Sequence, residues 1–92
     1  MHPNCPLPTS YLLNRDWTRT LIRRFMPEAD GRQSVDHWAN YQGTPTYFAL
    51  RVWEIEQSEE FGNAFLRSWK GRMKGRKPEA VLAELRKTPK PE

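Results

Sequence analysis

Residues 16–26 constrain the fold more than any other stretch of this 92-residue chain. Thr18 is typical of a helix N-cap, because its hydroxyl accepts a hydrogen bond from an amide one turn later. The apolar residues that follow share one helical stripe: Leu21, Ile22 and Phe25. Pro27 ends the stretch, since the residue before a proline avoids helical geometry. The sequence therefore predicts a short helix that docks on a core through one edge.

The polar residues of this helix lie mostly off the apolar stripe and are predicted to face solvent: Arg19, Thr20, Arg23 and Arg24. Arginine suits DNA, because its planar guanidinium binds a guanine edge bidentately or holds a phosphate. A helix built this way is typical of the second helix of a helix-turn-helix unit. The alternative is a solvated face whose arginines pair with Glu28 or Asp16.

Most of the positive charge lies toward the C-terminal end. Residues 1–60 hold six Lys or Arg and eight Asp or Glu, whereas residues 61–92 hold nine and three. The cations of the 67–77 segment are Arg67, Lys70, Arg72, Lys74, Arg76 and Lys77. We predict that they neutralise phosphates, which releases counterions and gives a salt-dependent affinity. The alternative is a solvated helix end beside a disordered tail.

The sequence predicts a small antiparallel hairpin after the arginine-bearing helix. Runs at 37–40 and 46–48 are rich in aromatic or β-prone residues, and residues 41–45 between them have turn chemistry. The alternative places Pro45 at the first position of a long helix. Residues 32–36 are expected to be irregular. Before the arginine-bearing helix, a flexible segment at 1–8 with three prolines precedes a short helix at 11–15, capped by Thr9 and Ser10.

A further helix is expected from about Ala49, and Ser58 is typical of a fresh helix start. Whether residues 45–74 form one kinked helix or two stays open. Pro78 opens a last expected helix, in a basic C-terminal extension over residues 76–92. The fold prediction is a mainly α domain at 9–75 with a small β-hairpin. Its predicted core consists of Leu12, Leu13, Trp17, Leu21, Ile22, Phe25, Trp38, Tyr47, Val52, Ile55, Phe61, Phe65 and Trp69.

The sequence offers few residues for catalysis or metal binding. Its one cysteine, Cys5, and its two histidines, His2 and His37, fall short of the four ligands of a structural zinc site. Asp36 is poorly placed to orient His37, because neighbours in a strand face opposite sides. No nucleophile motif or glycine-rich phosphate loop is present, and no stretch approaches the length of a membrane span or a secretion signal. We therefore expect no enzymatic activity, no metal or cofactor, no membrane association, and a cytoplasmic location.

Two helices, a hairpin and a further helix form an order that resembles the winged-helix DNA-binding domains of the MerR and excisionase group. Residues 17–25 are similar to the second helix of that group, in which a capping Ser or Thr precedes a Thr-Leu-Arg core. Tyr47, followed by Arg51 and Val52, is similar to the aromatic strand that leads into the third helix. The resemblance implies a winged helix-turn-helix core with double-stranded DNA as its partner.

A closer resemblance, over about residues 11–61, is to small and mostly uncharacterised bacterial and phage proteins. The residues that match their recurring pattern are Trp17, Thr18, Leu21, Ile22, Arg23, Phe25, Glu28, Asp30, His37, Tyr47, Arg51 and Val52. The chain departs from the pattern at Met26, Ala29 and Trp38. This resemblance implies the fold more than an activity.

Two functions are therefore kept open. One is a small DNA-binding protein, either an excisionase-like architectural factor or a regulator. The other is a phage or mobile-element protein that binds and inhibits a host protein, such as a nucleic-acid enzyme. Direct DNA binding weakens steeply with salt, so a duplex-binding assay distinguishes the two. The sequence leaves the oligomeric state and the DNA site open.

Overall fold

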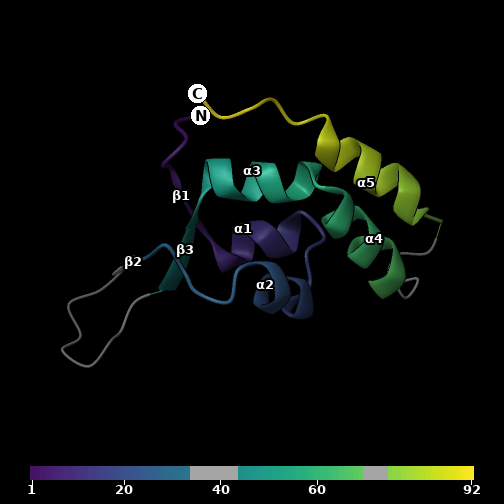
Figure 1. The fold of residues 1–92 in the computed structure, drawn as a ribbon, viewed down its shortest axis with the longest axis horizontal. Helices are drawn as coiled ribbons and strands as arrows, with labels where there is room; N and C mark the ends of the chain where they lie inside the picture. Colours follow the sequence, from purple (N-terminus) through teal and green to yellow (C-terminus); the bar gives the residue numbers. More distant parts are fainter. Residues whose placement is uncertain (34–43, 70–74) are drawn as a thin grey trace.

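The structure is a computed structural model that describes residues 1–33, 44–69 and 75–92 (Figure 1). The elements in chain order are β1 (Pro6–Pro8), α1 (Thr9–Asn14), α2 (Arg19–Phe25), β2 (Gly31–Gln33), β3 (Thr44–Phe48), α3 (Ala49–Gln57), α4 (Glu59–Ser68) and α5 (Pro78–Arg86). The described part is thus a mixed α/β fold of five helices and one small antiparallel sheet. This agrees with the predicted class, mainly α with a small β part.

The second strand of the predicted hairpin is found within β3, and β3 pairs with a strand that was not predicted, β2. The strand order is β1-β3-β2, and β2 pairs with β3 through Gly31 opposite Thr46 and Gln33 opposite Thr44. Residues 32 and 33 were expected to be irregular, and the run at 37–40 lies outside the described residues. Glycine favours the close approach of the strands, because a Cβ at Gly31 would lie 3.3 Å from the Thr46 hydroxyl, a tight contact.

The alternative of a long helix beginning at Pro45 is wrong, because this residue lies within β3. It pairs with Arg32 of β2 and stands beyond the end of the β1 pairing, which starts at Thr46. This part of β3 is therefore paired on one side only, where the missing N–H of a proline is tolerated.

The N-terminal segment is a second correction. The prolines of residues 1–8 predicted a loose chain, yet Pro6–Pro8 forms β1, with Leu7 opposite Tyr47 and almost fully buried. An edge strand accepts proline because one side of its backbone needs no partner. Backbone bonds from Ala49 to Cys5 and from Leu50 to Pro3, both 3.0 Å, fasten the preceding residues to the start of α3.

The first two helices are found where they were expected. α1 begins at Thr9, so Thr9 and Ser10 lie inside the helix and do not cap it, because β1 runs directly into α1 through Pro8. Asp16 adopts a left-handed conformation (φ 67°) in the turn to α2, which a short polar side chain tolerates. Thr18 is confirmed as the N-cap of α2, with its hydroxyl accepting a 3.1 Å bond from the Leu21 amide. α2 ends at Phe25, one residue before the Met26 C-cap.

Residues 49–68 form two successive helices. Ser58 separates them, donating a hydrogen bond to the Ile55 carbonyl (2.6 Å) and accepting one from the Phe61 amide (3.2 Å). Because its hydroxyl ends one helix and caps the next, Ser58 stabilises a sharp break between two helices rather than one continuous, bent helix.

One apolar cluster joins all five helices. Every predicted core residue among the described ones is either buried or packed against it, whereas Trp38 lies outside the described residues. Members of the buried hydrophobic cluster that the prediction omitted are Leu7, Met26, Ala49, Ala64, Val81, Leu82 and Leu85. The last three belong to α5, so this helix is part of the core rather than of a separate extension.

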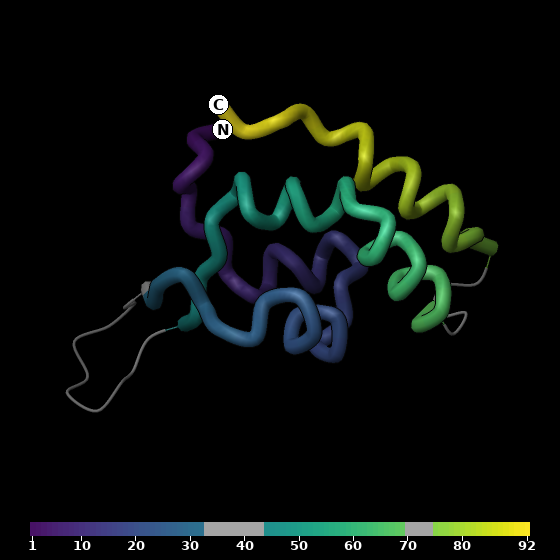
Figure 2. The backbone as a smooth tube through the Cα atoms, in the orientation of Figure 1, coloured from purple at the N-terminus to yellow at the C-terminus, as the bar shows by residue number. Residues whose placement is uncertain are grey.

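The chain beyond α5 also returns to the fold. Trp53 donates its indole N–H to the Thr88 carbonyl at 2.8 Å, and Pro91 is buried. The Glu92 amide bonds to the Met1 carbonyl at 2.8 Å, so the two ends of the tube lie together (Figure 2). Among the described residues, no helix is long and apolar enough to cross a membrane.

Candidate nucleic-acid interface

The orientation of α2 on the core is fixed by large apolar side chains. Leu21 and Ile22 are buried beneath the helix. Phe61 of α4 lies 4.8 Å from the Trp17 ring and meets Phe25 edge-on at 5.6 Å between ring centroids. Rolling α2 about its axis would withdraw Leu21, Ile22 and Phe25 from these contacts and lose buried area.

The opposite face of α2 carries the predicted contact residues, all exposed: Arg19, Thr20, Arg23 and Arg24. Among the described residues, none of these arginines forms an ion pair. The alternative pairing with Glu28 or Asp16 is not observed there, since Asp16 pairs with Arg76. The Arg24 guanidinium lies 5.5 Å from the Phe25 ring centroid, which is a favourable cation–π arrangement.

The second predicted set of cations is only partly described. Arg67 is exposed in the last turn of α4, and Arg76 and Lys77 are exposed just before α5. Lys70, Arg72 and Lys74 lie outside the described residues. The Arg76 guanidinium lies 3.3 Å from the Asp16 carboxylate, so the end of the basic segment meets the turn that precedes α2.

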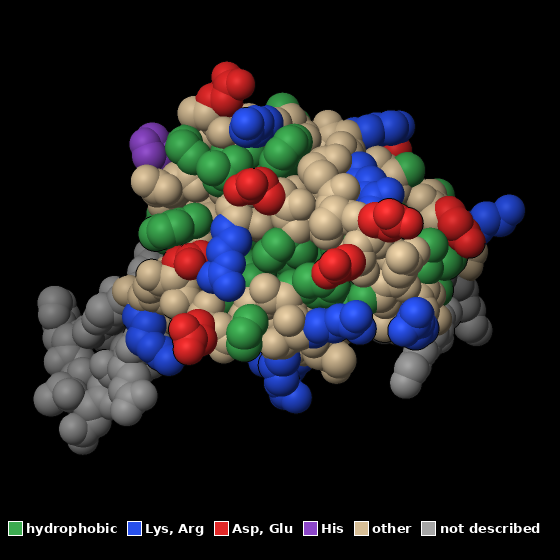
Figure 3. Space-filling model, viewed as in Figure 1, with side chains coloured by type: hydrophobic (Ala, Val, Ile, Leu, Met, Phe, Trp, Pro, Cys, Tyr) green, Lys and Arg blue, Asp and Glu red, His purple; other side chains and the backbone are tan. Residues whose placement is uncertain are grey.

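Surface charge is distributed unevenly over the described residues. Lys and Arg side chains project along the lower edge in Figure 3, where Figure 1 places α2 and the end of α4. Acidic side chains interleave with basic ones over the rest of this face. Basic side chains therefore predominate along this edge of the face that Figure 3 shows.

Asp30 fixes the sheet to the end of α2. Its carboxylate accepts hydrogen bonds from the Arg51 guanidinium (2.8 Å) and from the Phe48 amide (2.9 Å). Arg51 also donates to the Glu28 carbonyl at 3.1 Å. Arg32 of β2, a cation that the prediction left out of the site, is exposed in the strand that starts the hairpin. A sequence prediction that started the hairpin at Gly31, a residue typical of turns, would have placed Arg32 in the hairpin and so in the site.

Arg15 and Glu56 form a buried polar network that was not predicted. The Arg15 guanidinium donates to both carboxylate oxygens of Glu56, at 3.0 and 2.7 Å, and to the Thr88 hydroxyl at 2.9 Å. The Trp17 indole donates to the same carboxylate at 2.8 Å. Burial alone would lower the pKa of Arg15, but the hydrogen bond and the charge of Glu56 outweigh it and raise this pKa further. Arg15 therefore stays charged, and its bonds to Glu56 connect the end of α1 to α3.

The described residues hold no group of three or more His, Cys, Asp or Glu side chains placed to bind a metal ion. His37 lies outside the described residues. A comparison of the chain with family models, with curated proteins and with solved structures finds no match.

Proposed function

We propose that this protein binds duplex DNA, as an excisionase-like architectural factor or a small regulator, through α2 and the basic segment 67–77. The observation that carries the proposal is the outer face of α2. Its three arginines are exposed and form no ion pair among the described residues, on a helix whose orientation the core fixes. These arginines can therefore contact phosphates or base edges without first breaking a salt bridge among the described residues.

The dimensions of α2 suit the major groove. An α-helix with its side chains is about 10–12 Å in diameter, which fits a groove about 12 Å wide. Arg19 and Arg23 are four residues apart and share one helix face. We assign them contact with base edges. Arg67 and the cations that follow it are assigned to phosphates, which position a protein without reading sequence.

The order of elements supports a winged-helix arrangement. In this interpretation α1 and α2 are the helix-turn-helix pair, β2 and β3 form the wing, and α3 follows the wing as in the MerR and excisionase group. The wing then places Arg32 where it adds a phosphate contact beside the groove that α2 occupies.

The test is a duplex-binding assay on a site obtained by random-site selection, repeated over a range of salt concentrations. Arg19→Ala and Arg23→Ala are expected to cost about 1–3 kcal/mol on the selected site and to relax the preference at one base pair each. Lys77→Ala is expected to weaken all sequences alike and to reduce the salt slope by about one. Lys90→Ala is the matched control, because it removes one charge from the tail, on the side of the molecule opposite α2 (Figure 1).

Each part of the proposal fails on a different result. Arg19 and Arg23 variants that bind like the Lys90 variant would exclude α2 as the reading helix. A wild-type protein without salt-dependent duplex affinity would exclude DNA altogether. The inhibitor of a host protein would then take its place, and copurification would be the next experiment.

A further inference from the structure

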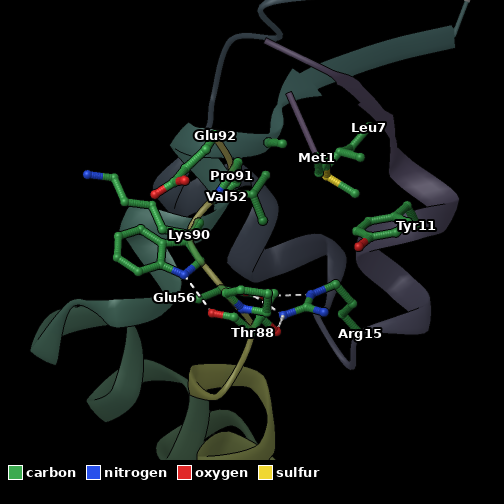
Figure 4. Close-up of a pocket in the computed structure, with 13 residues that line it drawn as sticks. Met1, Leu7, Tyr11, Arg15, Val52, Glu56, Thr88, Lys90, Pro91 and Glu92 are labelled. Atoms are coloured by element: carbon green, nitrogen blue, oxygen red, sulfur yellow. Dashed lines mark hydrogen bonds and ion pairs between the residues drawn. The ribbon is translucent and has the colours of Figure 1, made fainter. Parts of the chain in front are cut away.

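The structure contains a pocket of about 290 Å³ whose lining includes no residue of α2. Its walls come from α1, α3, the N-terminal segment and the tail after α5 (Figure 4). The apolar part consists of Met1, Leu7, Ala49, Val52, Pro89 and Pro91, together with the rings of Tyr11 and Trp53. The tail closes one side, held by the bond from Trp53 to Thr88 and by the bond from Glu92 to Met1.

The polar groups of the pocket are few and lie together. Arg15 and Thr88 line it at one end, and Tyr11 faces the same space from α1 (Figure 4). The Arg15 guanidinium lies 5.9 Å from the Tyr11 ring centroid. The Arg15 charge is matched by Glu56, whose side chain is only 2% exposed. At the rim, Lys90 and Glu92 carry opposite charges. Among the side chains that line the pocket, a charged ligand would therefore meet no uncompensated opposite charge, although it would lose its hydration.

The volume sets the size of the occupant. An apolar cavity of about 150 Å³ holds benzene, so a pocket about twice as large holds about ten non-hydrogen atoms. Apolar walls with a few convergent polar groups are typical of sites for small organic molecules.

We propose that this pocket binds a small uncharged aromatic compound with a single hydrogen-bonding group. The rings of Tyr11 and Trp53 and the aliphatic wall receive the aromatic part, and the Tyr11 hydroxyl meets the polar group. Benzamide is the simplest compound of this kind. The proposal is independent of DNA binding, because the pocket and the outer face of α2 share no residue.

The experiment titrates the full chain with benzamide and with benzoate, which has the same shape but carries a charge. The readout is the NMR signal of the Trp53 indole N–H, which donates to Thr88 at the pocket wall. Benzamide is expected to shift this signal saturably, with a dissociation constant on the order of 0.1–1 mM for a ligand of this size. Benzoate is expected to bind about tenfold more weakly or worse, because its carboxylate is desolvated without compensation.

Two variants locate the site. Tyr11→Phe removes one oxygen from a half-buried side chain and is expected to weaken benzamide binding about threefold to tenfold, the value of one hydrogen bond. Tyr47→Phe is the matched control, because it removes the same atom from a residue that does not line the pocket. No saturable shift with benzamide, equal affinity for benzoate, or equal effects of the two variants would each overturn the proposal.

Discussion

Two arginines close together in the sequence have opposite surroundings. Arg15, at the end of α1, donates hydrogen bonds from its guanidinium to Glu56 and Thr88, and its side chain is 19% exposed. Arg23, on α2, is exposed and forms no ion pair among the described residues. The residue type is the same, and the difference lies in what the fold brings beside each one. Arg15 is held by a carboxylate from α3, whereas nothing among the described residues neutralises the outer face of α2.

This difference separates a structural role from a candidate binding role. A buried charge pair is costly to break, because the remaining partner stays unpaired in an environment that solvates it poorly. An exposed arginine costs little to remove. Replacing Arg15 is therefore expected to lower the stability of the protein. Replacing an exposed arginine of α2 is expected to lower its DNA affinity instead.

The largest effect on stability is expected for Glu56→Ala. This change leaves the Arg15 guanidinium and the Trp17 indole without their shared acceptor. Breaking a buried pair from one side typically costs about 3–5 kcal/mol. Urea denaturation measures the free energy of unfolding, and Glu54→Ala, which removes an exposed carboxylate from the same helix, is the control. Equal losses for the two variants would mean that the network contributes no more than a surface charge.

Alkaline pH should not weaken this pair within the range in which proteins fold. The pKa of Arg15 is raised in the folded state, so the stability that follows from the shift is present in full below the unfolded pKa. It is lost only as pH rises through the folded pKa, which lies above the already strongly basic usual value.

The next largest effect is expected for Arg86→Ala, which tests whether a second half-buried arginine behaves like Arg15. Its guanidinium donates to the backbone carbonyls of Glu56 (3.1 Å) and Ser58 (2.8 Å), where α3 ends. Hydrogen bonds from a charged donor contribute about 1.5–3 kcal/mol, so a loss in that range is expected in urea denaturation. Lys87→Ala removes a neighbouring exposed cation and should leave the free energy of unfolding nearly unchanged. A similar loss for both would show that α5 is held by its apolar face alone.

Local sequence signals predicted the elements that depend on local interactions. The Thr18 and Ser58 caps and the stop before Pro27 each involve residues within one helical turn, and each was found as predicted. β1 and the first strand of the hairpin were missed, because strand pairing joins residues far apart in sequence. Leu7, for example, is buried in the core and pairs with Tyr47 of β3, which lies far from it in the sequence.

The site was predicted in the same uneven way. The exposed face of α2 follows from helical spacing alone, and the structure has that face. The spacing did not reveal that Arg76 meets Asp16, nor that Arg15 and Arg86 turn inward. Their partners lie on other helices, and no local signal separates an arginine that will find a buried carboxylate from one that will not.

A smaller effect on stability is expected for Thr18→Ala, which weakens the start of α2 without changing the charges on its exposed face. The change removes the acceptor of the Leu21 amide at the start of α2. Loss of such a cap costs about 1 kcal/mol. Thr20→Ala, on the exposed face of the same helix, is the control for the thermal unfolding curve. If both variants unfold alike, core contacts rather than the cap set the start of α2.

The smallest effect on stability is expected for Arg23→Ala. Its side chain is exposed, and among the described residues it forms no ion pair whose loss would leave a partner unsatisfied. Exposed substitutions of this kind change the free energy of unfolding by less than about 0.5 kcal/mol, and alanine is a slightly better helix former than arginine. Urea denaturation of this variant beside Glu56→Ala gives the direct contrast. A loss above about 1 kcal/mol would place Arg23 with Arg15 as a structural residue, and the reduced DNA affinity of the variant would then reflect unfolding rather than a lost contact.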